Sequence, residues 1–460
     1  MRVHRISRPL IAAGVFRKAL PVLEAALLIG IFALVGTGEP AVPSTSTLPD
    51  TAQPSASTPG VRLSALQGLG RFALVWGSHL YVADGAAGVL RQIPSVGVAA
   101  TPTWSHDGHW LAYHRLLGAN TATSETWIAR ADGGASYRVG QARGASPDDL
   151  AWSPTTATLA AVLRDSSGKS GLWLTNPGGI SRPLRAAGDA VTSFAWSPDG
   201  AMIAYVATVS LPVRHDVVST IRLRDGQIVR RFTASADTAV VLAGWWPNGR
   251  GLVFWLDPDY SQSLAADGLD LFALALDGST SRAIAGTLPY RDWLSWAPDG
   301  HTLLLVDGGG REVWRGKHLV VCDVARGTCR RIPQPASDVS VDPAWAPDGS
   351  TIAFVRAQQR ADSSGGARTG VDWTTTRTLW LTASNGTGAH ELSYVRGGVF
   401  APAWATDGRA LLFWQDDALW LWRSRSSDVV RIIGPFPQHA ALTDFFGHVS
   451  WTDIVSWSRP

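Results

Sequence analysis

The sequence is poor in cysteine, methionine and lysine, and its charged content is low. Of 460 residues, two are cysteines and two are methionines, and lysine supplies only three of the 40 basic residues. Two cysteines cannot supply a four-cysteine zinc site, and their C-x6-C spacing fits no common zinc motif. Charged residues make up 17% and apolar residues 45%, a balance that predicts a folded chain with a large core and argues against disorder.

The folded part also lacks an excess of positive charge. Five basic residues against Glu24 give residues 1–38 a charge of +4, and the total of +3 leaves −1 for the rest. No basic stripe remains that would follow a phosphate backbone. We therefore expect no nucleic-acid partner.

The two cysteines, Cys322 and Cys329, flank a short turn in "VVCDVARGTCRRI". In a hairpin with its turn near residues 325–326 they would face each other across two strands. The sequence favours a cross-strand disulfide, which requires an oxidising compartment. The alternative is a pair of unrelated thiols.

The N-terminus has the pattern of an export signal. Basic residues precede the apolar stretch 19–36, which predicts that whatever follows is exported. Residues 1–36 are expected to be either a cleaved signal peptide or a signal-anchor helix that holds the protein in the membrane. Residues 37–62 are rich in Ser, Thr and Pro and predict an extended linker, followed by a folded unit over 63–460.

One phrase recurs along the folded part, in forms such as "AWSPDGAMIAYVA" and "AWAPDGSTIAFVR". Pro presets the first corner of a turn, Asp bonds back to the backbone, and Gly accepts a positive φ, so each phrase predicts strand, tight turn, strand. A period near 50 residues with short strands is typical of a β-propeller. The leading tryptophans are Trp104, Trp152, Trp196, Trp245, Trp296, Trp345 and Trp404.

Counting strands gives the number of blades. Eight apolar hairpins follow the turns, whereas only seven phrases precede them, and "DIVSWSRP" at the C-terminus supplies an eighth inner strand. We therefore predict an all-β propeller of eight four-stranded blades, closed by residues 453–457 pairing with strands from 71–94. Seven blades remain the alternative.

The phrase "WSPDG" followed by "IAYVA" or "IAFVR" and an apolar hairpin resembles the TolB-type, WD40-like β-propeller repeat over residues 63–460. The resemblance implies a scaffold that binds proteins or peptides at the cell envelope. TolB itself resembles a six-bladed propeller with an extra N-terminal domain, and this chain is expected to lack that domain. A role in the Tol-Pal system is therefore not expected.

No motif for catalysis is found. G-x-S-x-G, H-E-x-x-H and the P-loop pattern are absent, and no residues remain for the hydrolase domain of prolyl oligopeptidase-like enzymes. We expect a non-enzymatic scaffold without cofactor or metal. The alternative is an enzyme or carbohydrate-binding module that uses the central channel. A glycosidase there would need paired carboxylates, with Asp148, Asp149, Asp292 and Asp342 as candidates.

Long loops indicate where a partner would bind. Segments 208–218, 257–269, 307–317 and 356–377 fall on one face of the predicted propeller, where long loops usually carry binding. Trp314 and Trp373 are expected to act as aromatic anchors. The alternative is length drift in tolerant loops. The candidate binding residues are Arg214, His215, Tyr260, Arg311, Trp314, Arg315 and Trp373.

Overall fold

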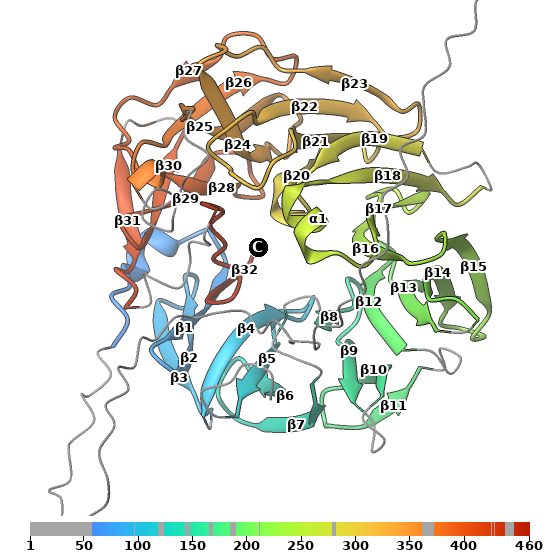
Figure 1. Ribbon diagram of the computed structural model, residues 1–460. Helices are drawn as coiled ribbons and strands as arrows, with labels where there is room; N and C mark the ends of the chain where they lie inside the picture. Colours follow the sequence, from blue (N-terminus) through green and yellow to red (C-terminus); the bar gives the residue numbers. More distant parts are fainter. Residues whose placement is uncertain are drawn as a thin grey trace, which may run out of the picture. The chain divides into compact units, whose positions relative to one another are not determined.

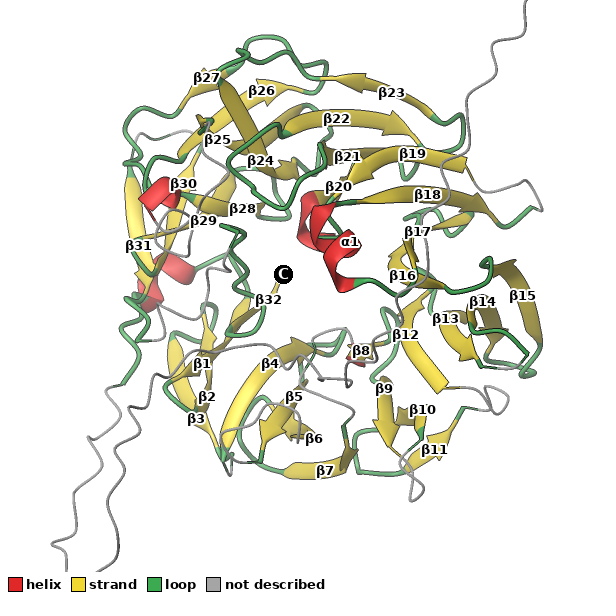
Figure 2. Ribbon diagram, viewed as in Figure 1, coloured by secondary structure: helices red, strands yellow, loops and turns green. Residues whose placement is uncertain are grey.

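The described residues form eight antiparallel sheets of four strands each, which are arranged as blades around a ring (Figure 1). Helix is confined to short segments such as α1 (Gln262–Asp267) (Figure 2). This result confirms the predicted all-β propeller and its eight blades. The structure is a computed structural model that describes residues 58–460, apart from 96, 118–123, 143–145, 147–148, 165–168, 185–189, 211, 278–281, 361–371, 425, 427 and 438–445.

The expected signal or anchor segment, residues 1–36, lies outside the described residues, as does most of the expected linker. Across the described part of the chain, every helix is too short or too polar to cross a membrane.

Blades are numbered here in chain order, and each is given from its innermost strand outward. Blade 1 consists of β32 (Val455–Ser458), β1 (Arg71–Trp76), β2 (His79–Asp84) and β3 (Val89–Ile93). Blades 2 to 4 are β4 (Val98–Trp104), β5 (Trp110–Leu116), β6 (Ser124–Arg130), β7 (Ser136–Gln141); β8 (Leu150–Trp152), β9 (Leu159–Arg164), β10 (Ser170–Thr175), β11 (Ser181–Pro183); and β12 (Ala190–Trp196), β13 (Met202–Val209), β14 (His215–Arg222), β15 (Ile228–Thr233).

Blades 5 to 8 follow the same order. They are β16 (Thr238–Trp245), β17 (Gly251–Pro258), β18 (Leu269–Ala275), β19 (Arg282–Thr287); β20 (Leu294–Trp296), β21 (Thr302–Asp307), β22 (His318–Asp323), β23 (Thr328–Arg331); β24 (Asp338–Trp345), β25 (Thr351–Gln358), β26 (Thr378–Ala383), β27 (His390–Glu391); and β28 (Phe400–Trp404), β29 (Ala410–Gln415), β30 (Ala418–Arg423), β31 (Val429–Ile433).

Burial falls from the second strand of a blade to its outer edge. In blade 6, four consecutive residues of β21 are buried, whereas all four residues of β23 are exposed. The second strand packs against neighbouring blades on both of its faces, so its sequence is a continuous apolar run without alternation. The outer strand faces water and carries polar residues.

The repeated turns form a second ring of contacts. Asp299 accepts a hydrogen bond from the backbone N–H of His301 at 2.9 Å, as the turn chemistry requires. Gly349, in the equivalent turn of blade 7, has φ of 74°. A Cβ atom there would come within 3.0 Å of Cγ of Pro298 in the blade 6 turn. Glycine is therefore needed both for its backbone conformation and for the close approach of neighbouring turns.

The repeat tryptophan joins neighbouring blades. Trp152 on blade 3 donates its indole N–H to the carbonyl oxygen of Thr103 on blade 2, at 3.2 Å. Thr103 directly precedes the tryptophan of its own blade, so the same bond can recur around the ring. It recurs from Trp104 to Ser456, Trp196 to Ala151, Trp245 to Ala195 and Trp404 to Ala344.

Blade 1 is composite, because β32 from the C-terminal end pairs with β1. Phe72 and Trp457 are register partners, and their rings stack with centroids 5.6 Å apart. This inner strand is not linked to the next by a turn phrase, and Arg71 occupies the corresponding place. Its guanidinium donates to the carbonyl oxygen of Gly108 at 2.7 Å and to Asp84 at 2.8 Å.

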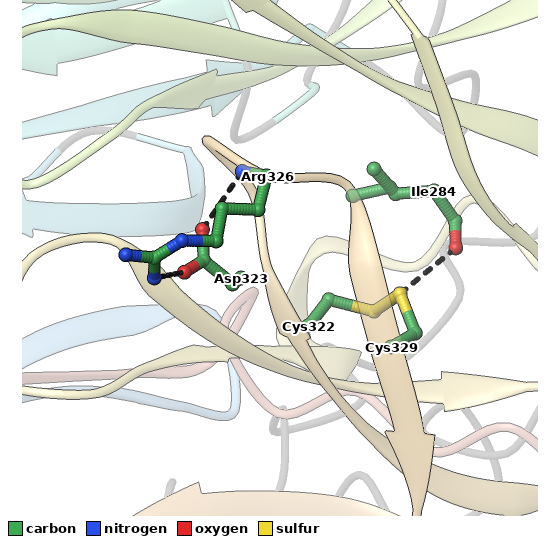
Figure 3. Close-up of a disulfide and its surroundings, with 5 residues drawn as sticks. All are labelled: Ile284, Cys322, Asp323, Arg326 and Cys329. Atoms are coloured by element: carbon green, nitrogen blue, oxygen red, sulfur yellow. Dashed lines mark hydrogen bonds and ion pairs between the residues drawn. A yellow bond between two sulfur atoms is a disulfide. The ribbon is translucent and has the colours of Figure 1, made fainter.

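The predicted disulfide is confirmed. Cys322 on β22 and Cys329 on β23 are register partners, and their sulfur atoms are 2.06 Å apart. Figure 3 shows the bond beside the hairpin turn, where Asp323 accepts hydrogen bonds from the backbone N–H and the guanidinium of Arg326. The bond indicates an oxidising compartment outside the cytoplasm.

Candidate functional site

The two predicted aromatic anchors are not at the surface. Trp314 is 0% exposed and Trp373 is 1% exposed. Their rings lie 6.5 Å apart, and the Trp373 indole N–H donates to the carbonyl oxygen of Gln358 at 3.0 Å. The long loops fold inward and use both rings as their own core, so neither ring is exposed, and their role as anchors of a partner stays a prediction.

Arg214, His215 and Tyr260 come together on blades 4 and 5. The Arg214 guanidinium lies 3.4 Å from the Tyr260 ring centroid, and the Tyr260 hydroxyl donates to Asp216 at 2.9 Å. Burial, with a further contribution from Asp216, raises the pKa of Tyr260 to about 12. His215 Nδ1 lies 2.8 Å from the carbonyl oxygen of Val213. The contacts of Tyr260 with Asp216 and Arg214 join the two blades.

Arg311 and Arg315 lie apart from that group. Arg311 donates to Asp267 at 2.6 Å, and its guanidinium lies 5.4 Å from the Phe446 ring. Arg315 is exposed, and its carbonyl oxygen accepts a hydrogen bond from Lys317 at 3.2 Å. The seven predicted binding residues therefore take part in several local sets of contacts within the protein. Their role in partner binding stays a prediction.

The strongest candidate site lies in the channel at the centre of the ring. Two cavities there, of ≈130 and ≈530 Å³, share Ala403, Trp451 and Thr452 in their walls. The narrower one is also lined by Asp292, Asp342, Pro343, Ala401, Pro402 and Ser450. The wider one is also lined by Thr101, Pro102, Thr103, Leu150, Val455, Ser456, Trp457 and Arg459.

Three residues with a strained backbone face this channel. Thr101, Asp342 and Ala401 have φ of 51°, 50° and 48°, and each precedes a proline at a bulge of an inner strand. A positive φ is unfavourable for a residue with a side chain and persists only where the surrounding structure enforces it. Such strain gathers at functional sites, and it occurs both here and in the 257–269 loop, where Asp259 and Tyr260 have φ of 59° and 49°.

Asp292 and His448 form a charge-bearing pair at the narrower cavity. Nε2 of His448 lies 2.9 and 3.1 Å from the two carboxylate oxygens of Asp292. The imidazole stacks on the Tyr290 ring with centroids 3.7 Å apart. Asp292 belongs to the short 3-10 helix η3 (Arg291–Trp293), and His448 comes from the connection before β32. Two segments 156 residues apart thus supply one acid–base pair.

Asp342 lines the same cavity but is fixed by its partners. It accepts hydrogen bonds from the Trp293 indole at 2.8 Å and from the Ala401 backbone N–H at 3.1 Å, and Arg377 lies 3.5 Å away. Arg377, which is fully buried, also donates to the carbonyl oxygen of Gly447. Asp342 and Arg377 therefore hold in place the segment that carries His448.

The four candidate carboxylates lie in different surroundings. Asp292 and Asp342 line one cavity, Asp149 is buried at 1% exposure, and Asp148 lies outside the described residues. Sequence reasoning missed His448 and Arg377, because neither belongs to a repeat phrase or a motif. No group of three metal-ligating side chains occurs within the described part of the chain.

No family model matches the chain, and no curated protein matches it. Its fold is found in solved structures. Dipeptidyl peptidase 4 of Porphyromonas gingivalis aligns with a TM-score of 0.54 at 12% identity, over 79% of this chain and 59% of that one. A prolyl endopeptidase aligns with 0.48 at 11%, over 75% and 51%. A putative TolB from Agrobacterium tumefaciens aligns with 0.32 at 14%, over 70% and 86%.

These comparisons correct the functional expectation. The solved structures of this fold include a peptidase, and this finding contradicts the expectation of a non-enzymatic scaffold. The chain spans only about half to three-fifths of those peptidases, and at 12% identity the likeness concerns the fold. The propeller architecture agrees with the TolB-type resemblance, and no family model specifies the repeat.

Proposed function

We propose that this protein is an enzyme-type propeller that acts outside the cytoplasm and takes its substrate into the central channel. Asp292 and His448 serve as the proton-transfer pair. The observation that carries the proposal is their direct contact at the wall of a channel cavity, where Trp451 and the hydroxyls of Ser450 and Thr452 also line the space.

The pair has the properties that general acid–base catalysis needs. A carboxylate on one ring nitrogen fixes the tautomer of the imidazole and stabilises its protonated form. Tyr290 stacks on one face of the His448 ring and Trp293 meets it edge-on at 5.8 Å, so the ring is held in one orientation. Asp342 is saturated with donors and acts as a positioning residue for Trp293 and, through Arg377, for the His448 segment.

Turnover tests the proposal directly. The full chain is incubated with peptide and oligosaccharide libraries, and products are followed by mass spectrometry. Asp292→Asn and His448→Gln should each lower the rate by about 100-fold or more, because positioned acid–base groups contribute about 10²–10⁴-fold. Asp270→Asn, an exposed aspartate on β18, is the matched control and should keep the full rate. Equal product from all variants would place the chemistry elsewhere, and no product from any library would refute the proposal.

Two features support the proposed location of the enzyme. The disulfide requires an oxidising compartment, and the apolar stretch 19–36 would hold the chain at the membrane. Alkaline extraction of membranes tests the tether. A signal anchor stays in the pellet, whereas a chain whose signal has been cleaved appears in the supernatant.

A further inference from the structure

The wider channel cavity has a positive charge in its wall. Among the described residues that line the cavity, Arg459 is the only charged one, and none of them is a carboxylate. The Arg459 guanidinium lies 4.9 Å from the ring centroid of Trp457, which also lines the cavity. Among the described residues, Arg459 has no ion-pair partner.

Arg459 is an exposed residue of the cavity wall, so its guanidinium is open to an anion that enters the cavity. Neighbouring protein atoms partly desolvate the guanidinium and lower its pKa. Arginine still keeps its charge at any physiological pH. A partly desolvated cation is stabilised by a charge-assisted bond to an anion, and a planar carboxylate matches the guanidinium fork.

A second polar group in the same wall lacks a partner. Thr101 is 3% exposed, and its hydroxyl oxygen forms no hydrogen bond with any described residue. Buried hydroxyls are nearly always paired, and because this oxygen has almost no surface of its own, it reaches a ligand in the cavity only after the side chain rotates about its Cα–Cβ bond. The same residue has the strained φ of 51° before Pro102, which fixes its position in the wall.

We propose that the wider cavity binds a carboxylate of the ligand, with Arg459 as its cation and the Thr101 hydroxyl as an additional donor. The proposal rests on the proposed function, in which the substrate occupies the channel. Trp451 and Trp457 would pack against the apolar body of the ligand. Because Asp292 lines the neighbouring narrower cavity, the carboxylate is repelled there and the ligand is oriented. A single arginine without a second cation suits a monovalent carboxylate better than a phosphate dianion.

Matched probes test this proposal by calorimetric titration of the full chain. The first pair is acetyl-trialanine with a free C-terminus and its C-terminal amide. The second is a glucuronate-containing disaccharide and its neutral glucose counterpart. In at least one pair the carboxylate form should bind about 10- to 100-fold more tightly than its neutral partner, as expected for a hydrogen-bonded charge pair. The pair that shows the difference identifies the source of the carboxylate.

Variants assign the preference to the cavity. Arg459→Gln should remove the preference for the carboxylate while leaving affinity for the neutral partner unchanged, and Arg459→Lys should restore part of it. Thr101→Val should weaken the carboxylate form several-fold without changing the fold. Arg224→Gln, an exposed arginine in a turn of blade 4, is the matched control. Equal affinity within both pairs, absence of binding by either carboxylate, or a preference that survives Arg459→Gln would each overturn the proposal.

Failure of this proposal is distinguishable from failure of the proposed function. Turnover that depends on Asp292 but not on Arg459 would support the proposed function and refute the carboxylate site. The opposite result is a carboxylate preference that depends on Arg459 together with turnover that Asp292→Asn and His448→Gln do not affect. It would support the carboxylate site and refute the catalytic roles of Asp292 and His448.

Discussion

Two seams between blades show how one repeat produces both tight and open contacts. At the seam between blades 1 and 2, Trp104 donates to Ser456 on the neighbouring blade, and Arg71 bridges to Gly108. The cavity on this seam measures ≈140 Å³. At the seam between blades 6 and 7, Trp345 donates instead to Gly349 in its own turn, and the cavity measures ≈600 Å³.

The comparison shows that the seam depends on where one indole N–H finds its acceptor. The indole N–H of Trp345 donates its hydrogen bond within its own blade, so the contact between blades 6 and 7 relies on other groups. Arg330 supplies one of these by donating to the carbonyl oxygens of Ser384 and Asn385. The disulfide is located there too, with Cys329 in the cavity wall. The composite seam, which lacks a turn phrase, is the tighter of the two because Arg71 takes the place of the turn.

Deleting residues 453–460 should have the largest effect, because it breaks the tight seam. The deletion removes β32, the Trp457 stack on Phe72 and the acceptor of Trp104. Loss of a buried aromatic side chain alone costs about 3–5 kcal/mol. Urea denaturation should therefore show a loss of more than about 5 kcal/mol or an unfolded chain. An unchanged midpoint would mean that the ring does not depend on this closure.

Acid should next weaken blade 2, which forms one side of the tight seam. His114 on β5 is fully buried, its Nε2 lies 3.1 Å from the Ser146 carbonyl oxygen, and burial lowers its pKa from 6.5 to about 4. Between these values the unfolded chain binds the proton and the folded chain does not, so stability falls as pH drops from 6.5 to 4. The loss should approach about 3 kcal/mol at 1.36 kcal/mol per pKa unit. His114→Gln should flatten this part of the stability-versus-pH curve, and an unchanged slope would contradict the assignment.

Removing the disulfide should affect the open seam to a smaller extent. The double variant Cys322→Ala/Cys329→Ala frees a loop with a sequence separation of 7. Loop-closure entropy for so short a loop predicts a loss of about 2 kcal/mol. Denaturation curves are compared for the oxidised wild type, the reduced wild type and the double variant. The last two should have the same midpoint, below that of the oxidised wild type. Coincidence of all three curves would show that the bond does not stabilise blade 6.

The smallest effect is expected from the two bridging arginines. Arg71→Ala removes a charge-assisted bond across the tight seam, so a loss of about 1–2 kcal/mol is expected. Arg330→Ala at the open seam removes more exposed bonds to carbonyl oxygens, with an expected loss below about 1 kcal/mol. Thermal melts of both variants rank the two seams. A larger loss for Arg330→Ala would reverse the comparison.

The repeat phrase made the fold predictable, because each part of it acts locally. Pro, Asp and Gly define the turn, the apolar run defines the second strand, and the count of tryptophans fixes eight blades once Trp457 is included. The disulfide was predictable for the same reason, since Cys322 and Cys329 belong to one hairpin. The site was less accessible to such reasoning. Asp292 and Asp342 could be named as carboxylates near inner strands, but their distance from each other and from His448 depends on ring closure.

The sequence by itself determined what neighbours along the chain control: turns, strand order, blade number and the pairing of two cysteines. The tertiary structure alone decided which side chains meet across the ring. Loop length predicted surface anchors, yet Trp314 and Trp373 are buried, because an aromatic side chain in a long loop gains more from packing against the domain than from facing water. Likewise, the unpaired Thr101 hydroxyl and the lone Arg459 cation become a site only when eight inner strands enclose them.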